Sequence, residues 1–293
     1  MLARVVALYN SAWPASLAIY KEGAQREMVV RRRLSVLWAA ATMLLTVLVC
    51  SGIAWAVTYG VPDGDEHPYV GLVALIDDKG EFVGRCSGTL LSPTVVLTAG
   101  HCTDVATRAK VWFDSEVNPA EGGVMGTPYT HPNFESGNLQ NDDSDVGVVV
   151  LDVPVPVEEI GTYGQLPELG VLDKLATQRG TQEQTFTIVG YGLQSVRPTL
   201  QEDLVRYKGT VSLIDLRSAI SDGHTIQITK NPGQRSSRGQ CPGDSGGPYL
   251  NDGTNVVVGI ASFSLNANCK GTSFAYRTDI AKTENFVNGF LLP

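Results

Sequence analysis

The stretch of sequence that decides the fold runs from Cys241 to Pro248 and reads CPGDSGGP. It places Ser245 in a tight, glycine-rich turn, where backbone N–H groups can converge on one point. Such a turn suits acyl transfer, because converging N–H groups stabilise the negative oxygen that forms during the reaction. A serine hydroxyl alone is a poor nucleophile, so this chemistry also needs a base that takes its proton and an acid that orients the base.

Candidates for both partners lie upstream. His101 stands in the segment TAGHC, directly after an apolar run, and Asp145 directly precedes the apolar segment VGVVVL. Asp142 and Asp143 compete with Asp145 for the role of the acid. We favour Asp145, because the apolar strand after it would bury its carboxylate against His101, whereas the other two would stay solvated.

These segments resemble those of the chymotrypsin/trypsin family of serine peptidases, in which the triad also follows the order His, Asp, Ser. The resemblance rests on TAGHC, DVGVVVLD and GDSGGP and covers Val57 to Pro293. We identify the chain as a secreted, bacterial-type, trypsin-like member. The resemblance implies an all-β fold of two antiparallel six-stranded β-barrels with a C-terminal helix. His101 and Asp145 would come from the first barrel and Ser245 from the second.

The resemblance also implies a role for each residue. His101 would take the Ser245 proton and return a proton to the leaving amine, while Asp145 holds the imidazole. The N–H groups of Gly243 and Ser245 would form the oxyanion hole. Asp244 would pair with a freshly cut N-terminal ammonium. Two cysteine pairs match the family's disulfide positions: Cys86 with Cys102, and Cys241 with Cys269.

A specificity pocket follows from the same resemblance. Where trypsin-like members carry an aspartate at the pocket base, this chain has Gly239. A pocket without a buried acid has no strong partner for an Arg or Lys side chain, because a buried cation needs pairing. Two serines near positions where members often have glycine indicate a narrow pocket and an uncharged P1 residue of small to medium size. The pocket residues are Gly239, Gln240, Ser262, Phe263, Ser264 and Ser273.

The hydrophobic pattern independently favours a β fold. Short β-branched segments alternate with Gly, Pro, Asn and Asp, which is typical of an antiparallel sandwich or barrel. Only the tail has a helical pattern, in which Thr278 and Asp279 could cap a helix whose apolar residues share one face. The expected strands are 70–76, 94–97, 109–113, 146–151, 185–189, 225–228 and 256–262. The apolar face of the tail comprises Ile280, Phe286, Val287, Phe290 and Leu291.

Residues 1–56 form the predicted export signal. A basic triplet, Arg31–Arg33, precedes an uncharged apolar stretch that ends near the small-x-small pattern at Ala54–Ala56, which predicts cleavage after Ala56. The alternative is a membrane anchor at residues 34–56, since this run is long enough to span a bilayer. Met28 is a second candidate for the start, which would make residues 1–27 an over-extended start.

The remaining residues, 57–293, form the expected peptidase domain, with the first barrel at about 57–160 and the second at about 161–293. Removing the signal also removes Cys50 and leaves an even number of cysteines, as an exported protein favours. A lipidated Cys50 is a weaker alternative, because Val49 is bulky where a lipoprotein signal wants a small residue. Cleavage would expose Val57 as the new terminus, and Val61 is its rival after a short propeptide.

Charge and motifs narrow the partners. The net charge is −8, and the first 56 residues are net basic, so the rest is more acidic still, which argues against a nucleic acid ligand. We expect a monomer with a polypeptide substrate, a proteinaceous inhibitor as a further partner class, and no membrane contact beyond the export signal. His67, His131 and His224 lack metal-ligand spacing, so we expect no catalytic metal and no cofactor.

Two other functions compete with a serine endopeptidase. One is a peptidase-like fold that binds without catalysis, against which the intact triad argues. The other is a lipase or esterase, whose nucleophile lies in a G-x-S-x-G elbow with its histidine last in the chain. Residues 243–247 match that pattern formally, but His101 comes first here.

Overall fold

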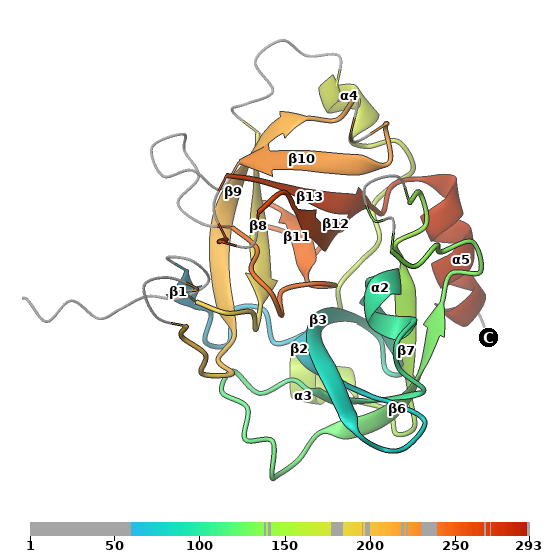
Figure 1. Ribbon diagram of the computed structural model, residues 1–293, viewed down its shortest axis with the longest axis vertical. Coiled ribbons are helices and arrows are strands. Elements are labelled where there is room, and N and C mark those ends of the chain that lie inside the picture. The colour runs from blue at the N-terminus through green and yellow to red at the C-terminus, as the bar shows by residue number, and fades with distance from the viewer. Residues whose placement is uncertain are drawn as a thin grey trace, which may run out of the picture. The chain divides into compact units, whose positions relative to one another are not determined.

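The protein is described by a computed structural model in which the placed residues form two β-barrels (Figure 1). The predicted export signal and Val57 lie outside the described residues. No helix in the described part of the chain is long and apolar enough to cross a membrane. The structure describes residues 60–137, 139, 142–176, 184–194, 196, 200–217, 220, 222–229, 239–266, 268–269 and 271–291.

Six antiparallel strands close the first barrel in the order β2-β3-β4-β7-β6-β5. Apolar side chains from these strands fill its interior, including Val73, Leu90, Val96 and Val148, none of which is exposed. Burial of such side chains is the main favourable contribution to folding. The strands are β2 (Val70–Ile76), β3 (Phe82–Ser92), β4 (Val95–Thr98), β5 (Arg108–Trp112), β6 (Val124–Thr130) and β7 (Gly147–Leu151).

The second barrel is closed by the order β9-β10-β13-β12-β11-β8, with β8 paired back to β9. A two-residue strand, β1 (Val61–Pro62), is added to the outside of β9, where Val61 lies opposite Lys208. The predicted pair of six-stranded antiparallel barrels is therefore confirmed. The strands are β8 (Thr185–Gly190), β9 (Tyr207–Asp215), β10 (Thr225–Thr229), β11 (Pro248–Asn251), β12 (Val257–Ser264) and β13 (Thr272–Arg277).

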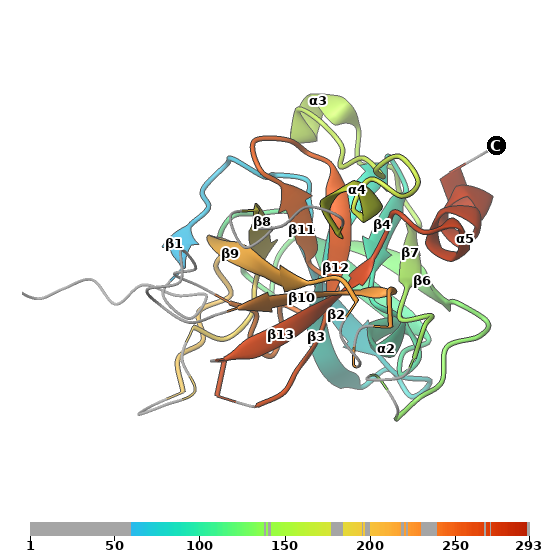
Figure 2. The ribbon, with the colours of Figure 1, turned by 90° about the horizontal axis from the view of Figure 1, so that it is seen from above.

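The C-terminal helix, α5 (Ala281–Leu291), packs on the first barrel beside β6 and β7 (Figure 2). Val287 is fully buried, and the ring of Phe290 lies 5.1 Å from that of Tyr129 on β6. The predicted helix is confirmed. Asp279, expected to cap it, instead pairs with Arg277 and accepts a hydrogen bond from the backbone of Leu172.

Three short helices were not expected from the sequence: α2 (Gly100–Thr103), α3 (Val157–Ile160) and α4 (Asp173–Ala176). Each has four residues, which is too short for a repeating apolar face to show in the sequence. The first of them, α2, carries His101. The boundary expected between the barrels, after residue 160, lies at the end of α3, while β1 pairs with the second barrel although its residues were assigned to the first.

A buried arginine ties the N-terminal segment to both barrels. Arg206, immediately before β9, is fully buried, and its Nε donates to the Asp63 carboxylate at 3.0 Å. Its other nitrogens donate to the Val70 and Gly64 carbonyls and to the Tyr191 hydroxyl. Because each guanidinium nitrogen has an acceptor, the desolvation cost of this cation is offset.

Candidate active site

His101 and Asp145 lie in contact. The Nδ1 atom of His101 is 3.0 Å from both carboxylate oxygens of Asp145, and the backbone N–H of His101 donates to the same carboxylate at 2.9 Å. Asp145 is completely buried, whereas the His101 side chain is 22% exposed. His101 therefore has its Nδ1 edge held inside the protein and its other edge available to a substrate.

The electrostatics of this pair follow from burial and contact. Burial raises the pKa of Asp145, but the charge and hydrogen bonds of His101, with a hydrogen bond from Ser262, bring that pKa below its ordinary value. Burial lowers the pKa of His101, but the Asp145 charge and hydrogen bond raise it above its ordinary value overall. An ionised carboxylate only accepts hydrogen bonds, so Nδ1 carries the proton and Nε2 of the neutral ring is left as a base.

A third side chain contacts the Asp145 carboxylate. The hydroxyl of Ser262, on β12 of the second barrel, donates to the Asp145 carboxylate. From the sequence we assigned Ser262 to the specificity pocket, whereas its side chain in the structure contacts the acid. Nothing in the motif around Ser262 indicates this bond, because its partner lies 117 residues away.

The competing acids are placed differently. Asp143 is exposed and pairs with Lys282 on α5. Asp142 is only 5% exposed, so the expectation that it stays solvated is wrong. Its carboxylate accepts hydrogen bonds from the backbone N–H groups of Glu135 and Ser144, and thereby shapes the loop that leads to Asp145.

The segment around Ser245 forms a tight turn before β11. Gly243 and Gly246 both have positive φ, at +97° and +79°, a region that favours glycine. A Cβ on Gly246 would lie 2.9 Å from the backbone nitrogen of Ala99 and 2.0 Å from the Thr98 hydroxyl. The turn therefore packs against the residues that directly precede α2, which brings the half-buried Ser245 to the histidine segment.

The hydrogen bonds of His101 in the described part of the chain go to Asp145, and none reaches Ser245. Nucleophile and base are often loosely aligned in the absence of substrate, so this geometry is compatible with a triad that tightens on binding.

Disulfides brace both halves of the site. Cys86 on β3 is joined to Cys102 on α2, with their Cα atoms 6.3 Å apart. Cys241, just before the turn that holds Ser245, is joined to Cys269, with 5.0 Å between Cα atoms. The two pairs are those that the resemblance implies. Both sulfurs near His101 are in a disulfide, so they are not thiolate ligands for a metal.

Asp244 points away from solvent, directly before Ser245 in the turn. It is fully buried, and its carboxylate accepts hydrogen bonds from the backbone N–H groups of Gly192 at 2.8 Å and Cys241 at 2.9 Å. A Cβ on Gly190 or Gly192 would lie within 2.6 Å of that carboxylate, so both positions need glycine. Asp244 thus ties the loop after β8 to the turn that holds Ser245.

Of the residues assigned to the specificity pocket, Gln240, Phe263, Ser264 and Ser273 are linked by hydrogen bonds. Gln240 is buried, and its amide donates to the Phe263 carbonyl at 2.8 Å and accepts from the Tyr249 hydroxyl at 2.7 Å. The hydroxyls of Ser264 and Ser273, on paired positions of β12 and β13, are hydrogen-bonded at 2.8 Å. The sequence did not indicate Tyr249, whose hydroxyl holds Gln240.

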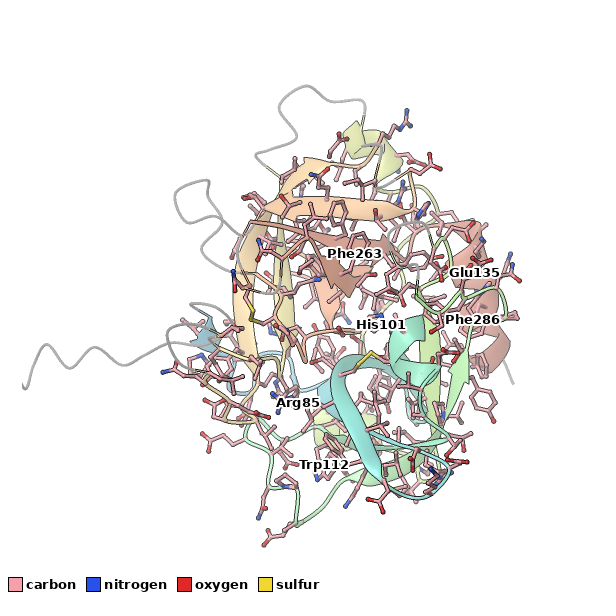
Figure 3. The ribbon with its side chains drawn as sticks, viewed as in Figure 1. Arg85, His101, Trp112, Glu135, Phe263 and Phe286 are labelled. Carbon is pink, nitrogen blue, oxygen red and sulfur yellow. A yellow bond between two sulfur atoms is a disulfide. The ribbon has the colours of Figure 1, made fainter. Side chains whose placement is uncertain are left out.

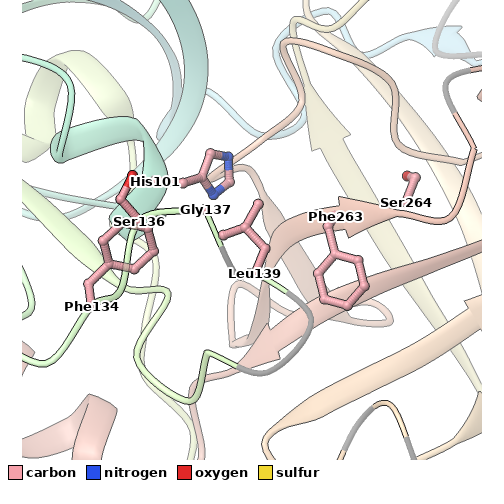
Figure 4. Close-up of a pocket in the computed structure, with 7 residues that line it drawn as sticks. All are labelled: His101, Phe134, Ser136, Gly137, Leu139, Phe263 and Ser264. Atoms are coloured by element: carbon pink, nitrogen blue, oxygen red, sulfur yellow. The ribbon is translucent and has the colours of Figure 1, made fainter.

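An open pocket adjoins His101. Its volume is about 510 Å³, and both His101 and Phe263 of the second barrel line it (Figures 3 and 4). Phe134, Leu139 and Phe263 give the pocket apolar walls beside His101. The pocket is lined by His101, Phe134, Ser136, Gly137, Leu139, Phe263 and Ser264.

Comparisons with curated proteins find animal peptidases. Brachyurin from Leptuca pugilator is 31% identical over 200 residues, which cover 63% of this chain and 78% of brachyurin. Trypsin theta from Drosophila melanogaster is 28% identical over 250 residues, with 75% and 87% covered. Chymotrypsin from Phaedon cochleariae is 27% identical over 209 residues, with 68% and 70% covered. These animal relatives lend no support to the expected bacterial-type placement.

Solved structures share the fold. HL collagenase superposes with a TM-score of 0.63 at 19% identity, over 78% of this chain and 96% of the collagenase. Neuropsin from mouse brain gives a TM-score of 0.59 at 18% identity, over 79% and 96%. The sequence model of the family described as Trypsin matches residues 63–287. The chain therefore belongs to the trypsin family of serine endopeptidases, which are hydrolases.

Proposed function

We propose that the protein cleaves peptide bonds through a triad of His101, Asp145 and Ser245. The observation that carries this proposal is the buried Asp145 carboxylate, which contacts the backbone and Nδ1 of His101 together. A carboxylate in that place fixes the ring orientation and leaves Nε2 to accept a proton. The same contact argues against a binding protein without catalysis, which has no need of an oriented base.

The reaction then proceeds in two halves. Ser245 Oγ attacks the peptide carbonyl carbon while His101 Nε2 takes its proton, and the carbonyl oxygen becomes negative. The C–N bond breaks as His101 gives that proton to the leaving amine, which leaves an ester on Ser245. Water, deprotonated by His101, attacks the ester, and the proton returns to Ser245 as the acid product departs.

The oxyanion would be held by the backbone N–H groups of Gly243 and Ser245. Such donors are aimed where charge develops in the transition state, and each contributes about 2.7 to 4 kcal/mol. The positive φ of Gly243 and the hydrogen bonds of Asp244 support this assignment, because they give the turn one conformation.

The chain is proposed to be exported, with its signal removed after Ala56, and to act as a monomer. The Val57 ammonium would then pair with Asp244 behind the nucleophile. Val61, the rival terminus, lies in β1 against β9. A proteinaceous inhibitor is the further partner that this site would accept.

Covalent labelling tests the proposed triad. Purified mature protein treated with a fluorophosphonate is expected to carry the adduct on Ser245, located by peptide mass spectrometry, because a fluorophosphonate reacts only with an activated serine. The same spectrum reads the mature N-terminus, expected at Val57. An adduct on another serine, or none on protein that starts at Val57, would contradict the triad.

The proposed P1 preference is an uncharged residue of small to medium size. None of the pocket side chains is acidic, so a buried Arg or Lys would lack a counter-charge. The bonded hydroxyls of Ser264 and Ser273 narrow the same space.

A peptide library profiled by mass spectrometry checks this preference. The double variant Ser264→Gly, Ser273→Gly removes both hydroxyls and is expected to shift the preference toward larger apolar P1 residues. Dominant cleavage after Arg or Lys in the unmodified protein would refute the pocket assignment. An unchanged profile in the double variant would show that these two serines do not limit the pocket.

A further inference from the structure

Ser87, on β3 of the first barrel, forms hydrogen bonds that connect that barrel to the turn around Ser245. It is fully buried. Its backbone N–H donates to the Ser245 carbonyl at 2.7 Å, and its side-chain hydroxyl donates to the Gly243 carbonyl at 2.9 Å. The same hydroxyl accepts the backbone N–H of Tyr191 at 2.9 Å. Each of these partners belongs to the second barrel.

The hydroxyl acts on one peptide unit in particular, the unit that joins Gly243 to Asp244. The N–H end of this unit donates to the Cys241 carbonyl at 2.9 Å, and its C=O end accepts from Ser87. The unit is therefore held at both ends. Gly243 has no Cβ to restrict rotation, so hydrogen bonds must supply the restriction.

This peptide unit stands between the two proposed oxyanion donors. The N–H of Gly243 belongs to the peptide unit before it, and the N–H of Ser245 belongs to the unit after it. The orientation of the middle unit consequently sets the angle between the two donors. The rate of acyl transfer depends steeply on the direction of these donors, because displacement of a catalytic group by about 1 Å can lower the rate about 100-fold.

We propose that Ser87 is a positioning residue for acyl transfer. Its hydroxyl fixes the orientation of the peptide unit between the two oxyanion donors. This inference rests on the proposed function of Ser245. It concerns the transition state more than the bound substrate, so loss of the hydroxyl should lower kcat and leave KM nearly unchanged.

The variant Ser87→Ala removes the hydroxyl and keeps the backbone N–H that holds the Ser245 carbonyl. We expect kcat, normalised to the folded fraction, to fall about 10- to 100-fold with KM within about twofold, because a lost buried hydrogen bond and a misaimed donor both act on the transition state. Amide exchange at Tyr191 should accelerate, since its N–H loses its acceptor. Ser87→Gly removes the same hydroxyl and supplies a second measurement.

Thr89→Val is the matched control. Thr89 lies two residues along β3, so it shares the face of Ser87. Its hydroxyl is buried without a hydrogen-bond partner in the part of the chain that the structure describes. Valine keeps its shape, so kcat and the exchange of Tyr191 should not change.

The outcomes separate this inference from the proposed function. If Ser245 of the unmodified protein takes up fluorophosphonate and Ser87→Ala keeps full kcat, the positioning role is wrong while the triad stands. A rise in KM at constant kcat would also overturn it. If the unmodified protein is not labelled at all, the proposed function is wrong, and the positioning role that rests on it is wrong as well.

Discussion

Replacement of Ser245 by alanine is expected to lower kcat by about 10⁶-fold, the scale on which removal of the nucleophile acts in a Ser–His–Asp triad. The loss is large because the acyl-enzyme can no longer form. A residual rate about 10³- to 10⁴-fold above that of water should remain, since the oxyanion donors and the substrate contacts are intact. Steady-state hydrolysis of a peptide anilide substrate, whose uncatalysed hydrolysis is slow, measures both levels.

Ser115→Ala serves as the comparison for this variant. Ser115 lies in the loop after β5 of the first barrel and does not line the pocket beside His101. It should keep kcat and fluorophosphonate labelling, whereas Ser245→Ala should lose both. A Ser245→Ala protein that retained more than about one hundredth of the rate would place the nucleophile elsewhere, because one acid–base contribution alone is about 10²- to 10⁴-fold.

The strands that sequence patterns predicted are short segments rich in β-branched and other apolar residues. The segment 70–76 is identical with β2, and the segment 185–189 differs from β8 by one residue. β3 was missed because glycine, arginine and serine interrupt its sequence, FVGRCSGTLLS. Its residues form a strand because they pair with both β2 and β4, and such pairing is a tertiary effect that local preference does not contain.

In the site, too, local motifs predicted some residues and missed the long-range contacts. Motifs predicted His101, Asp145 and Ser245, because each lies next to residues that constrain its own backbone. Two hydrogen bonds, from Ser262 to Asp145 and from Ser87 to Gly243, join residues that are 117 and 156 positions apart. No local sequence pattern contains such contacts. Arg206 was not expected in the interior either, since an arginine is buried only where acceptors from several segments meet it.

Asp145 is the member of the proposed triad whose replacement has the most specific expected effect. Asp145→Asn is expected to lower kcat by about 10⁴-fold, the magnitude that belongs to the triad of this family. The amide can donate to His101 as well as accept from it, so Nδ1 no longer has to carry the proton, and Nε2 loses its place as the base. The effect is thus one of tautomer and charge, with little change in shape.

The pH dependence of this variant distinguishes it from a merely damaged protein. In the unmodified protein kcat/KM should fall as the pH drops through the pKa of His101, which Asp145 raises above its ordinary value. Without that carboxylate, burial is the remaining influence on the ring, and burial lowers its pKa. The acid limb of the profile should therefore move to lower pH in Asp145→Asn.

Asp143→Asn and Asp142→Asn decide between the three acids that the sequence left open. Asp143 is exposed and bound to Lys282, so its amide variant should keep kcat within a few-fold and leave the acid limb in place. The Asp142 carboxylate accepts hydrogen bonds from backbone N–H groups of its own loop. Asp142→Asn should therefore lower the melting temperature and have little effect on the acid limb of the pH profile. An acid limb that moved in either variant as far as in Asp145→Asn would assign the orienting carboxylate to that residue, because only the group in contact with His101 can set the pKa of its ring.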